Sequence, residues 1–209
     1  MADSINPRDI DLAKVKSVGS SLTHIKVPFE LTMKEFLDFA SDDLKGKSLR
    51  HTINALGNIK RSIDCLFDSL LFATNLLEIS KSERWNFPEK MKTLGEIGII
   101  TPYILSKINS ARNLLEHEFK KPIREEVEVA FDIALLLHYS AVGFTRTYLT
   151  DIDFECEDEH WKFHIEINRE DRNIEIFYDK QNISVSWDES PEDYKKWLYL
   201  LYQLQYLRK

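Results

Sequence analysis

Residues 150–156, Thr-Asp-Ile-Asp-Phe-Glu-Cys, decide the fold class of this chain. Apolar side chains alternate with acidic ones in this stretch, and a period of two is typical of a β-strand with one buried face. The same alternation returns in residues 161–167, 174–178 and 183–187, with polar clusters between the runs. The sequence therefore predicts a small antiparallel meander of four strands.

Before residue 150 the apolar residues recur every three to four positions, which predicts helices. We expect helices over about 32–44, 48–79, 89–98, 101–121 and 125–149, and a last helix that begins at Ser190. Thr32 and Glu35 form a capping box at the first of these helices, and Pro122 interrupts the chain before the fifth. Residues 1–30 show weak periodicity and are expected to be an irregular arm. The predicted fold class is α+β.

This pattern predicts three regions along the 209 residues. Residues 1–47 hold the arm and a short helix, and residues 48–150 hold a bundle of long helices. Residues 151–209 hold the β-meander and the C-terminal helix, which we expect to pack on the bundle.

Composition excludes several classes of protein. The chain is 43% hydrophobic and 30% charged, and it carries a net charge of −7, which argues against a general coat for nucleic acid. Residues 151–209 contain 8 Lys and Arg against 15 Asp and Glu, so residues 1–150 are neutral. No signal peptide or membrane span is expected, and two distant cysteines fit the cytoplasm. No metal or other cofactor is expected.

The residues best suited to catalysis lie close together in Arg112-Asn113-Leu114-Leu115-Glu116-His117, within the helix expected before Pro122. On a helical wheel, Asn113 lies one turn before His117 and can orient its imidazole. Arg112 lies about 140° from His117. One straight helix cannot bring both to the same atom, so a two-fold partner that presents the same face is expected.

This set of side chains fits a metal-independent ribonuclease. An imidazole with a pKa of ~6.5 can accept the proton of a ribose 2′-hydroxyl or protonate the leaving 5′-oxygen. Arg112 remains charged and can stabilise the pentacoordinate phosphorus, and Glu116 can position Arg112. Lys120 and Lys121 are candidates to hold neighbouring phosphates. The expected product end is a 2′,3′-cyclic phosphate.

With Arg112-Asn113-x-x-x-His117 on a helix between long helices, the chain resembles the HEPN superfamily over about residues 48–150. The resemblance implies an all-α bundle that forms a homodimer through the motif helices, with Arg112 and His117 as the catalytic pair. It also implies an RNA substrate and a role as a toxin or phage-defence effector, with an antitoxin or another protein as a possible partner. Other members of the superfamily are inactive and bind a protein or nucleotide, and the strand-rich tail is outside the family pattern.

Three alternatives remain open on the sequence. The chain can be an active ribonuclease, a silent HEPN dimer that binds a protein or nucleotide, or a helical scaffold in which the motif is accidental. His51 is a minor candidate for the RNA site, and His138 is expected in the core. His160 and His164 are expected on solvent-facing strand positions about 13 Å apart, too far to share a metal ion. The acidic strand positions Asp153, Glu155, Glu157, Glu166 and Glu175 either keep the chain soluble, face a basic partner, or mimic nucleic acid.

Overall fold

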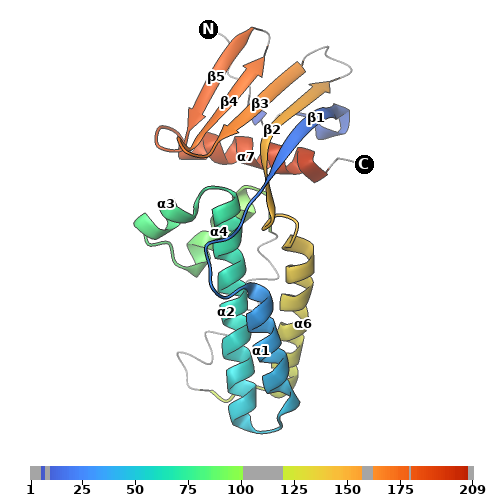
Figure 1. Cartoon of the computed structure of the whole chain (residues 1–209), viewed down its shortest axis with the longest axis vertical. Helices are drawn as coiled ribbons and strands as arrows, with labels where there is room; N and C mark the ends of the chain where they lie inside the picture. The colour runs from blue at the N-terminus through green and yellow to red at the C-terminus, as the bar shows by residue number, and fades with distance from the viewer. Residues whose placement is uncertain (1–5, 8–9, 101–119, 157–161, 179, 207–209) are drawn as a thin grey trace. The chain divides into compact units, whose positions relative to one another are not determined.

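The computed structural model describes residues 6–7, 10–100, 120–156, 162–178 and 180–206. Its elements, in chain order, are η2 (Leu12–Lys14), β1 (Val15–His24), α1 (Met33–Lys45), α2 (Leu49–Ala73), α3 (Leu77–Ser82), α4 (Phe87–Glu96), α6 (Arg124–Ala141), β2 (Thr147–Cys156), β3 (Lys162–Asn168), β4 (Asn173–Tyr178), β5 (Gln181–Ser186) and α7 (Pro191–Tyr206). Figure 1 shows these helices and strands. The fold class is α+β, as the sequence predicted.

The chain divides into two compact units. The helical unit consists of Ile25–Met91 and Thr101–Arg146, and the sheet unit consists of Met1–His24, Lys92–Ile100 and Thr147–Lys209. The acidic residues separate in the same way: the helical unit has 16 basic and 16 acidic residues, whereas the sheet unit has 12 and 19.

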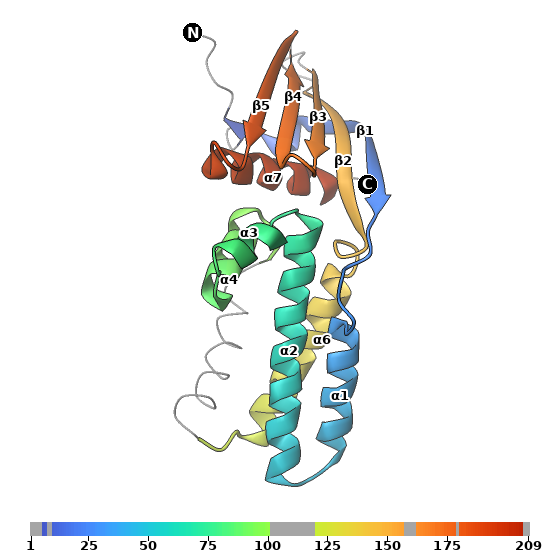
Figure 2. The ribbon, with the colours of Figure 1, turned by 60° about the vertical axis from the view of Figure 1, so that its left-hand side comes forward.

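The helical unit is built on α1, α2 and α6, which run side by side in Figure 2. The predicted capping box is present at the start of α1. The Thr32 side chain accepts from the backbone N–H of Glu35, and the Glu35 carboxylate accepts from the backbone N–H of Thr32 at 2.8 Å. The apolar face of α2 is fully buried along most of its length. The members of this core include Leu37, Ala40, Ile59, Ile63, Leu66, Phe67, Leu70, Val127, Ala130 and Ala134.

The prediction of one continuous helix over 48–79 is wrong near its C-terminal end. Helix α2 ends at Ala73, and α3 begins after a short break. Asn75 lies in the left-handed region with φ of 63°, a conformation that asparagine tolerates better than most residues. The Thr74 hydroxyl also donates to the carbonyls of Leu70 and Leu71, which closes the last turn of α2.

The expected helix over 125–149 also ends early. Helix α6 stops at Ala141, and the chain enters β2 at Thr147. Residues 147–149 form a ladder with β1, since His24, Thr23 and Leu22 face Thr147, Tyr148 and Leu149. This pairing with a distant strand replaces the last helical turns that local periodicity suggested.

The sheet unit contains an antiparallel sheet in the order β1-β2-β3-β4-β5. The four predicted strands are present as β2 to β5. The irregular arm expected over residues 1–30 is wrong for Val15–His24, which forms β1 on the edge of the sheet beside β2. Register shifts at Ser17/Gly19 and Ser21/Leu22 interrupt the alternation of β1, so its sequence lacks a clean period of two.

One face of the sheet packs against α7, as Figure 1 shows. The core between them is rich in aromatic side chains. Phe154 and Phe163 stack at 4.9 Å between ring centroids, and Phe163 stacks on Tyr178 at 4.5 Å. Lys195 of α7 forms ion pairs with Glu96 at 2.7 Å and Glu192 at 2.6 Å, which attaches the end of α4 to α7. The opposite face of the sheet, which we call the open face, carries the outward positions of the strands.

Within the described residues, no helix is both long enough and apolar enough to cross a bilayer.

Candidate functional site

The predicted catalytic residues Arg112, Asn113, Glu116 and His117 lie outside the described residues, as does His160. The description of the chain stops at Ile100 and resumes at Lys120, where both Lys120 and Lys121 are exposed. Helix α6 begins at Arg124, two residues after Pro122, which matches the expected position of the next helix. The structure therefore shows the chain that follows the motif, from Lys120 onward.

Arg124 fixes the start of α6 to the C-terminal end of α1 and the turn that follows it. Its guanidinium donates to the backbone carbonyls of Leu44 and Gly46, at 2.6 Å for Gly46, and its Nε lies 2.8 Å from a carboxylate oxygen of Glu128. Leu44 lies in the last turn of α1, and Gly46 follows that helix. Charge-assisted bonds to the carbonyls at a helix end are favourable because they satisfy acceptors that the helix leaves free.

These bonds gather basic side chains from distant parts of the sequence at one end of the helical unit. Lys121 lies three residues before Arg124, so its Cα is within about 11 Å of that residue. The turn between α1 and α2 adds Lys47, and the start of α2 adds Arg50; both are exposed. We call Lys47, Arg50, Lys120 and Lys121 the basic end.

His51 also lies at this end, in the first turn of α2. Its Nδ1 is 2.6 Å from the Ser48 hydroxyl, and its ring packs on Gly46 so closely that a Cβ there would meet it at 2.4 Å. Position 46 thus needs glycine for close approach. The imidazole is held in place, and one of its nitrogens is already engaged.

The basic end is bordered by acidic residues. Asp42 pairs with Lys45, and Asp43 accepts from the Asn58 amide at 3.0 Å. Glu125 and Glu126 occupy the first turn of α6, where carboxylates interact favourably with the positive end of the helix dipole. The arrangement suits a local contact with a few phosphates better than a continuous track along nucleic acid.

His138, which the sequence placed in the core, is only half-buried on α6. Burial lowers its pKa, and the nearby cations Lys34 and Arg146 lower the pKa further. The neutral imidazole is therefore favoured, and its ring meets that of Tyr139 edge-on at 5.4 Å.

The open face of the sheet carries the second concentration of polar side chains. Asp151, Glu166 and Glu175 are cross-strand neighbours and form a row that ends at Ser184 of β5. The adjacent row runs from Asp153 through His164 and Phe177 to Asn182. Four of the five acids predicted to share a face thus do so, and Glu157 lies outside the described residues.

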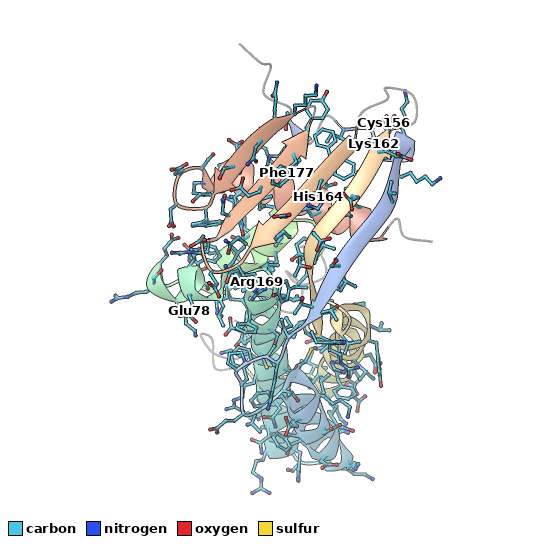
Figure 3. The ribbon with its side chains drawn as sticks, turned by 45° about the horizontal axis from the view of Figure 1, so that its top comes forward. Glu78, Cys156, Lys162, His164, Arg169 and Phe177 are labelled. Atoms are coloured by element: carbon cyan, nitrogen blue, oxygen red, sulfur yellow. The ribbon has the colours of Figure 1, made fainter. Side chains whose placement is uncertain are left out.

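His164 is the centre of this face, as Figure 3 shows, with Phe177 on the neighbouring strand. Its Nδ1 lies 2.8 Å from Asp153, and its Nε2 lies 3.0 Å from Glu166. The hydrogen bond to Glu166 raises the pKa of His164, burial opposes the shift, and the bond to Asp153 adds to it. Because both ring nitrogens bond to carboxylates, this site favours the protonated form of His164.

A hollow of about 520 Å³ lies on the open face. It is bounded by residues of all five strands, from Val18 on β1 to Asn182 on β5. Phe177 and His164 provide ring surface, and Lys162 and Glu155 pair with each other at 3.1 Å on its border. The sequence pattern predicted which residues share this face, but it could not predict the hollow, because the hollow depends on the register of four strand pairs.

Sequence reasoning missed a half-buried cation in the sheet unit. The Arg169 guanidinium lies 4.2 Å from the centroid of the Tyr148 ring, and burial lowers its pKa. Burial also raises the pKa of Tyr194 to about 12, and this phenol has no hydrogen-bond partner among the described residues. No local sequence signal identifies such a contact, because Tyr148 and Arg169 belong to different strands and turns.

The described residues contain no group of three or more His, Cys, Asp or Glu side chains that could hold a metal ion. Comparisons of the chain with protein-family models, with curated proteins and with solved structures find no match.

Proposed function

We propose that this protein is a metal-independent endoribonuclease of the HEPN type that acts in the cytoplasm as a toxin or phage-defence effector. The observation that carries the proposal is the sequence Arg112-Asn113-x-x-x-His117 between the long helices α2 and α6. Permanent positive charge and a base that titrates near neutral pH are the two groups that cleavage of RNA by its own 2′-hydroxyl needs.

The basic end supports the choice of RNA as substrate. Lys120 and Lys121 follow soon after the motif in sequence. Arg124 joins their segment to the turn that carries Lys47, and Arg50 lies just beyond that turn, at the start of α2. The helical unit is neutral overall, so these cations are not outweighed by a large negative charge within their own unit. Phosphates on either side of the scissile bond are the natural ligands of such exposed lysines.

In the proposed reaction His117 accepts the proton of the 2′-hydroxyl as the oxygen attacks phosphorus. Arg112 stabilises the extra negative charge of the pentacoordinate phosphorus. The 5′-oxygen then leaves with a proton from the imidazolium, and the other fragment keeps a 2′,3′-cyclic phosphate. Asn113 orients the imidazole and Glu116 positions the guanidinium, and no cofactor takes part.

The direct test is cleavage of total RNA by the purified chain in EDTA, with His117→Ala and Arg112→Ala beside it. His24→Ala is the matched control, because His24 is an exposed histidine at the end of β1. We expect both motif variants to lose at least about 100-fold in rate and the control to keep its rate. Equal cleavage by His117→Ala, or ends other than cyclic phosphates, would remove the proposal.

The proposed homodimer through the motif helices has its own test. If each site takes His117 from one subunit and Arg112 from the other, mixing the two inactive variants creates dimers with one complete site. Random exchange of subunits should then restore about a quarter of the wild-type rate. No recovery after subunit exchange is verified would mean that both residues act within one subunit.

A second candidate is a catalytically silent module of HEPN type that binds a protein partner. It is favoured by one face of α6, where Val129, Leu136 and Tyr139 are 58%, 69% and 64% exposed. These positions follow helical spacing, and an exposed apolar stripe of this kind is typical of an interaction surface. A dimer that cleaves no RNA, and that loses its partner or its dimeric state in Leu136→Glu, would favour this candidate over the ribonuclease.

A further inference from the structure

The outer edge of β5 differs from the other edge of the sheet. Its six residues, Gln-Asn-Ile-Ser-Val-Ser over 181–186, contain no charge, no proline and no glycine. They pair with β4 in a continuous register from Tyr178↔Gln181 to Asn173↔Ser186. Edge strands are normally protected by charges, prolines or bulges, and β1 shows two such irregularities. Within the described part of the chain, no strand lies beyond β5.

The backbone of β5 offers hydrogen-bonding groups along this edge. Tyr178 and Gln181 flank a connection of two residues, so Gln181, Ile183 and Val185 direct their N–H and C=O groups toward β4. The bond from the Trp187 N–H to the Arg172 carbonyl continues this alternation. The groups of Asn182 and Ser184 therefore point outward, where an added strand would meet them.

The surroundings of the edge select the side chains of such a strand. On the open face, Ser184 is small and stands beside Glu175, behind which lie Glu166 and Asp151. A long cationic side chain placed opposite Ser184 can extend across it toward Glu175. Asn182 stands at one end of the hollow beside Phe177, which is 37% exposed, so an apolar or aromatic side chain fits opposite Asn182.

We propose that the edge of β5 binds an extended basic segment of a partner protein as a sixth, antiparallel strand. Backbone bonds to Asn182 and Ser184 supply affinity, and the acidic row and the hollow supply specificity. The preferred pattern is a basic residue opposite Ser184 and, two positions later, an apolar residue opposite Asn182. A second copy of this chain fits poorly, because its own β5 has no basic residue to present to Glu175. The inference does not depend on the ribonuclease activity.

The test uses the full chain and a labelled, capped peptide of sequence Thr-Val-Arg-Val-Phe-Thr, with binding measured by fluorescence anisotropy. Ser184→Pro removes the outward N–H without removing a bond of the sheet, and Ser184→Ala is its control, since both variants lose the hydroxyl that bonds Asn173. We expect Ser184→Pro to weaken binding at least about tenfold and Ser184→Ala to bind like the parent. Circular dichroism verifies the fold of both variants.

Two further peptides keep the test independent of that substitution. A peptide methylated on the backbone nitrogens that would face β5 should not bind the wild-type chain, and one with glutamate in place of arginine should bind at least about tenfold more weakly. Glu175→Gln should reduce the difference between the arginine and glutamate peptides. Undiminished binding of the methylated peptide, or equal binding of the glutamate peptide, would overturn the proposal. A wild-type dimer that Ser184→Pro dissociates would also overturn it, with a second copy as the occupant.

Discussion

The helical unit and the sheet unit differ in their net charge and in the direction in which each shifts the pKa of a histidine. The helical unit balances its acidic and basic residues, and its half-buried His138 is kept neutral by burial beside Lys34 and Arg146. The sheet unit carries the whole excess of acid, and Asp153 and Glu166 raise the pKa of its His164. An acidic surface repels nucleic acid and attracts basic protein. The difference is consistent with both proposals, RNA at the helical unit and a basic protein segment at the sheet unit.

The largest expected effect separates the two cores. Phe67→Ala removes a buried ring that stacks on Phe87 at 4.9 Å in the helical unit, and Phe154→Ala removes the matching stack on Phe163 in the sheet unit. Each should lower the free energy of unfolding by about 3–5 kcal/mol. Hydrogen exchange followed peptide by peptide should show faster exchange mainly in the unit that carries the change. Equally faster hydrogen exchange in both units would mean that they unfold together, and the two units could not be compared as separately stable parts.

The next effect concerns RNA affinity. The double variant Lys120→Ala/Lys121→Ala should weaken binding of single-stranded RNA and reduce the slope of log affinity against log salt by about 0.7 for each phosphate that the variant no longer neutralises. Lys162→Ala/Lys180→Ala makes the same change of charge on the sheet unit and is the control. The measurement is fluorescence anisotropy over a range of salt concentrations, with His117→Ala as the parent so that RNA stays intact. If Lys162→Ala/Lys180→Ala weakens RNA binding as much as Lys120→Ala/Lys121→Ala does, the RNA is not bound preferentially by the helical unit.

A smaller effect tests the cap of α1. Thr32→Ala removes both the side-chain acceptor for the Glu35 N–H and the hydroxyl that donates to the Glu35 carboxylate. We expect a loss of about 1 kcal/mol in chemical denaturation. Thr32→Ser is the comparison, since a serine hydroxyl can make both bonds. A loss for Thr32→Ser as large as that for Thr32→Ala would show that the cap geometry is not what matters.

The smallest effect is the opposite response of the two histidines to pH. The raised pKa of His164 contributes stability below the ordinary histidine value of ~6.5, and this contribution is lost as pH rises through the folded-state pKa. The lowered pKa of His138 contributes stability above ~6.5 that is lost as pH falls through its folded-state pKa. NMR titration of the imidazole protons measures both. Glu166→Gln should lower the pKa of His164 and leave the pKa of His138 unchanged. An unchanged pKa of His164 would contradict the hydrogen bond to Glu166 on the open face.

Local signals predicted the elements whose stabilising contacts are close in sequence. The capping box of α1 and the alternating strands β2 to β5 are of this kind. Strand β1 was missed because two register shifts and many small polar residues hide its alternation. The ends of α2 and α6 were misplaced because Asn75 adopts a left-handed conformation and because Thr147 pairs with His24, which local periodicity does not report.

The candidate site divides in the same way. The spacing of Arg112 and His117 and the shared face of the strand acids follow from periodicity alone. The basic end does not, because Arg124 reaches the carbonyls of Leu44 and Gly46 far upstream in the sequence. The unprotected edge of β5 also required the sheet order, since a strand of uncharged residues is ordinary in the centre of a sheet and becomes significant only at its edge.

The pairing of β1 with β2 has a consequence for synthesis on the ribosome. The nearest partners in this ladder are His24 and Thr147, so β1 emerges long before the strand that completes it. At ordinary translation speeds the delay is on the order of 10 s, during which the contacts between α1 and α2 can already form. A strand that waits unpaired risks aggregation. The Ser, Gly and Thr residues of β1 reduce that risk because they leave little apolar surface for a nascent neighbour to cover.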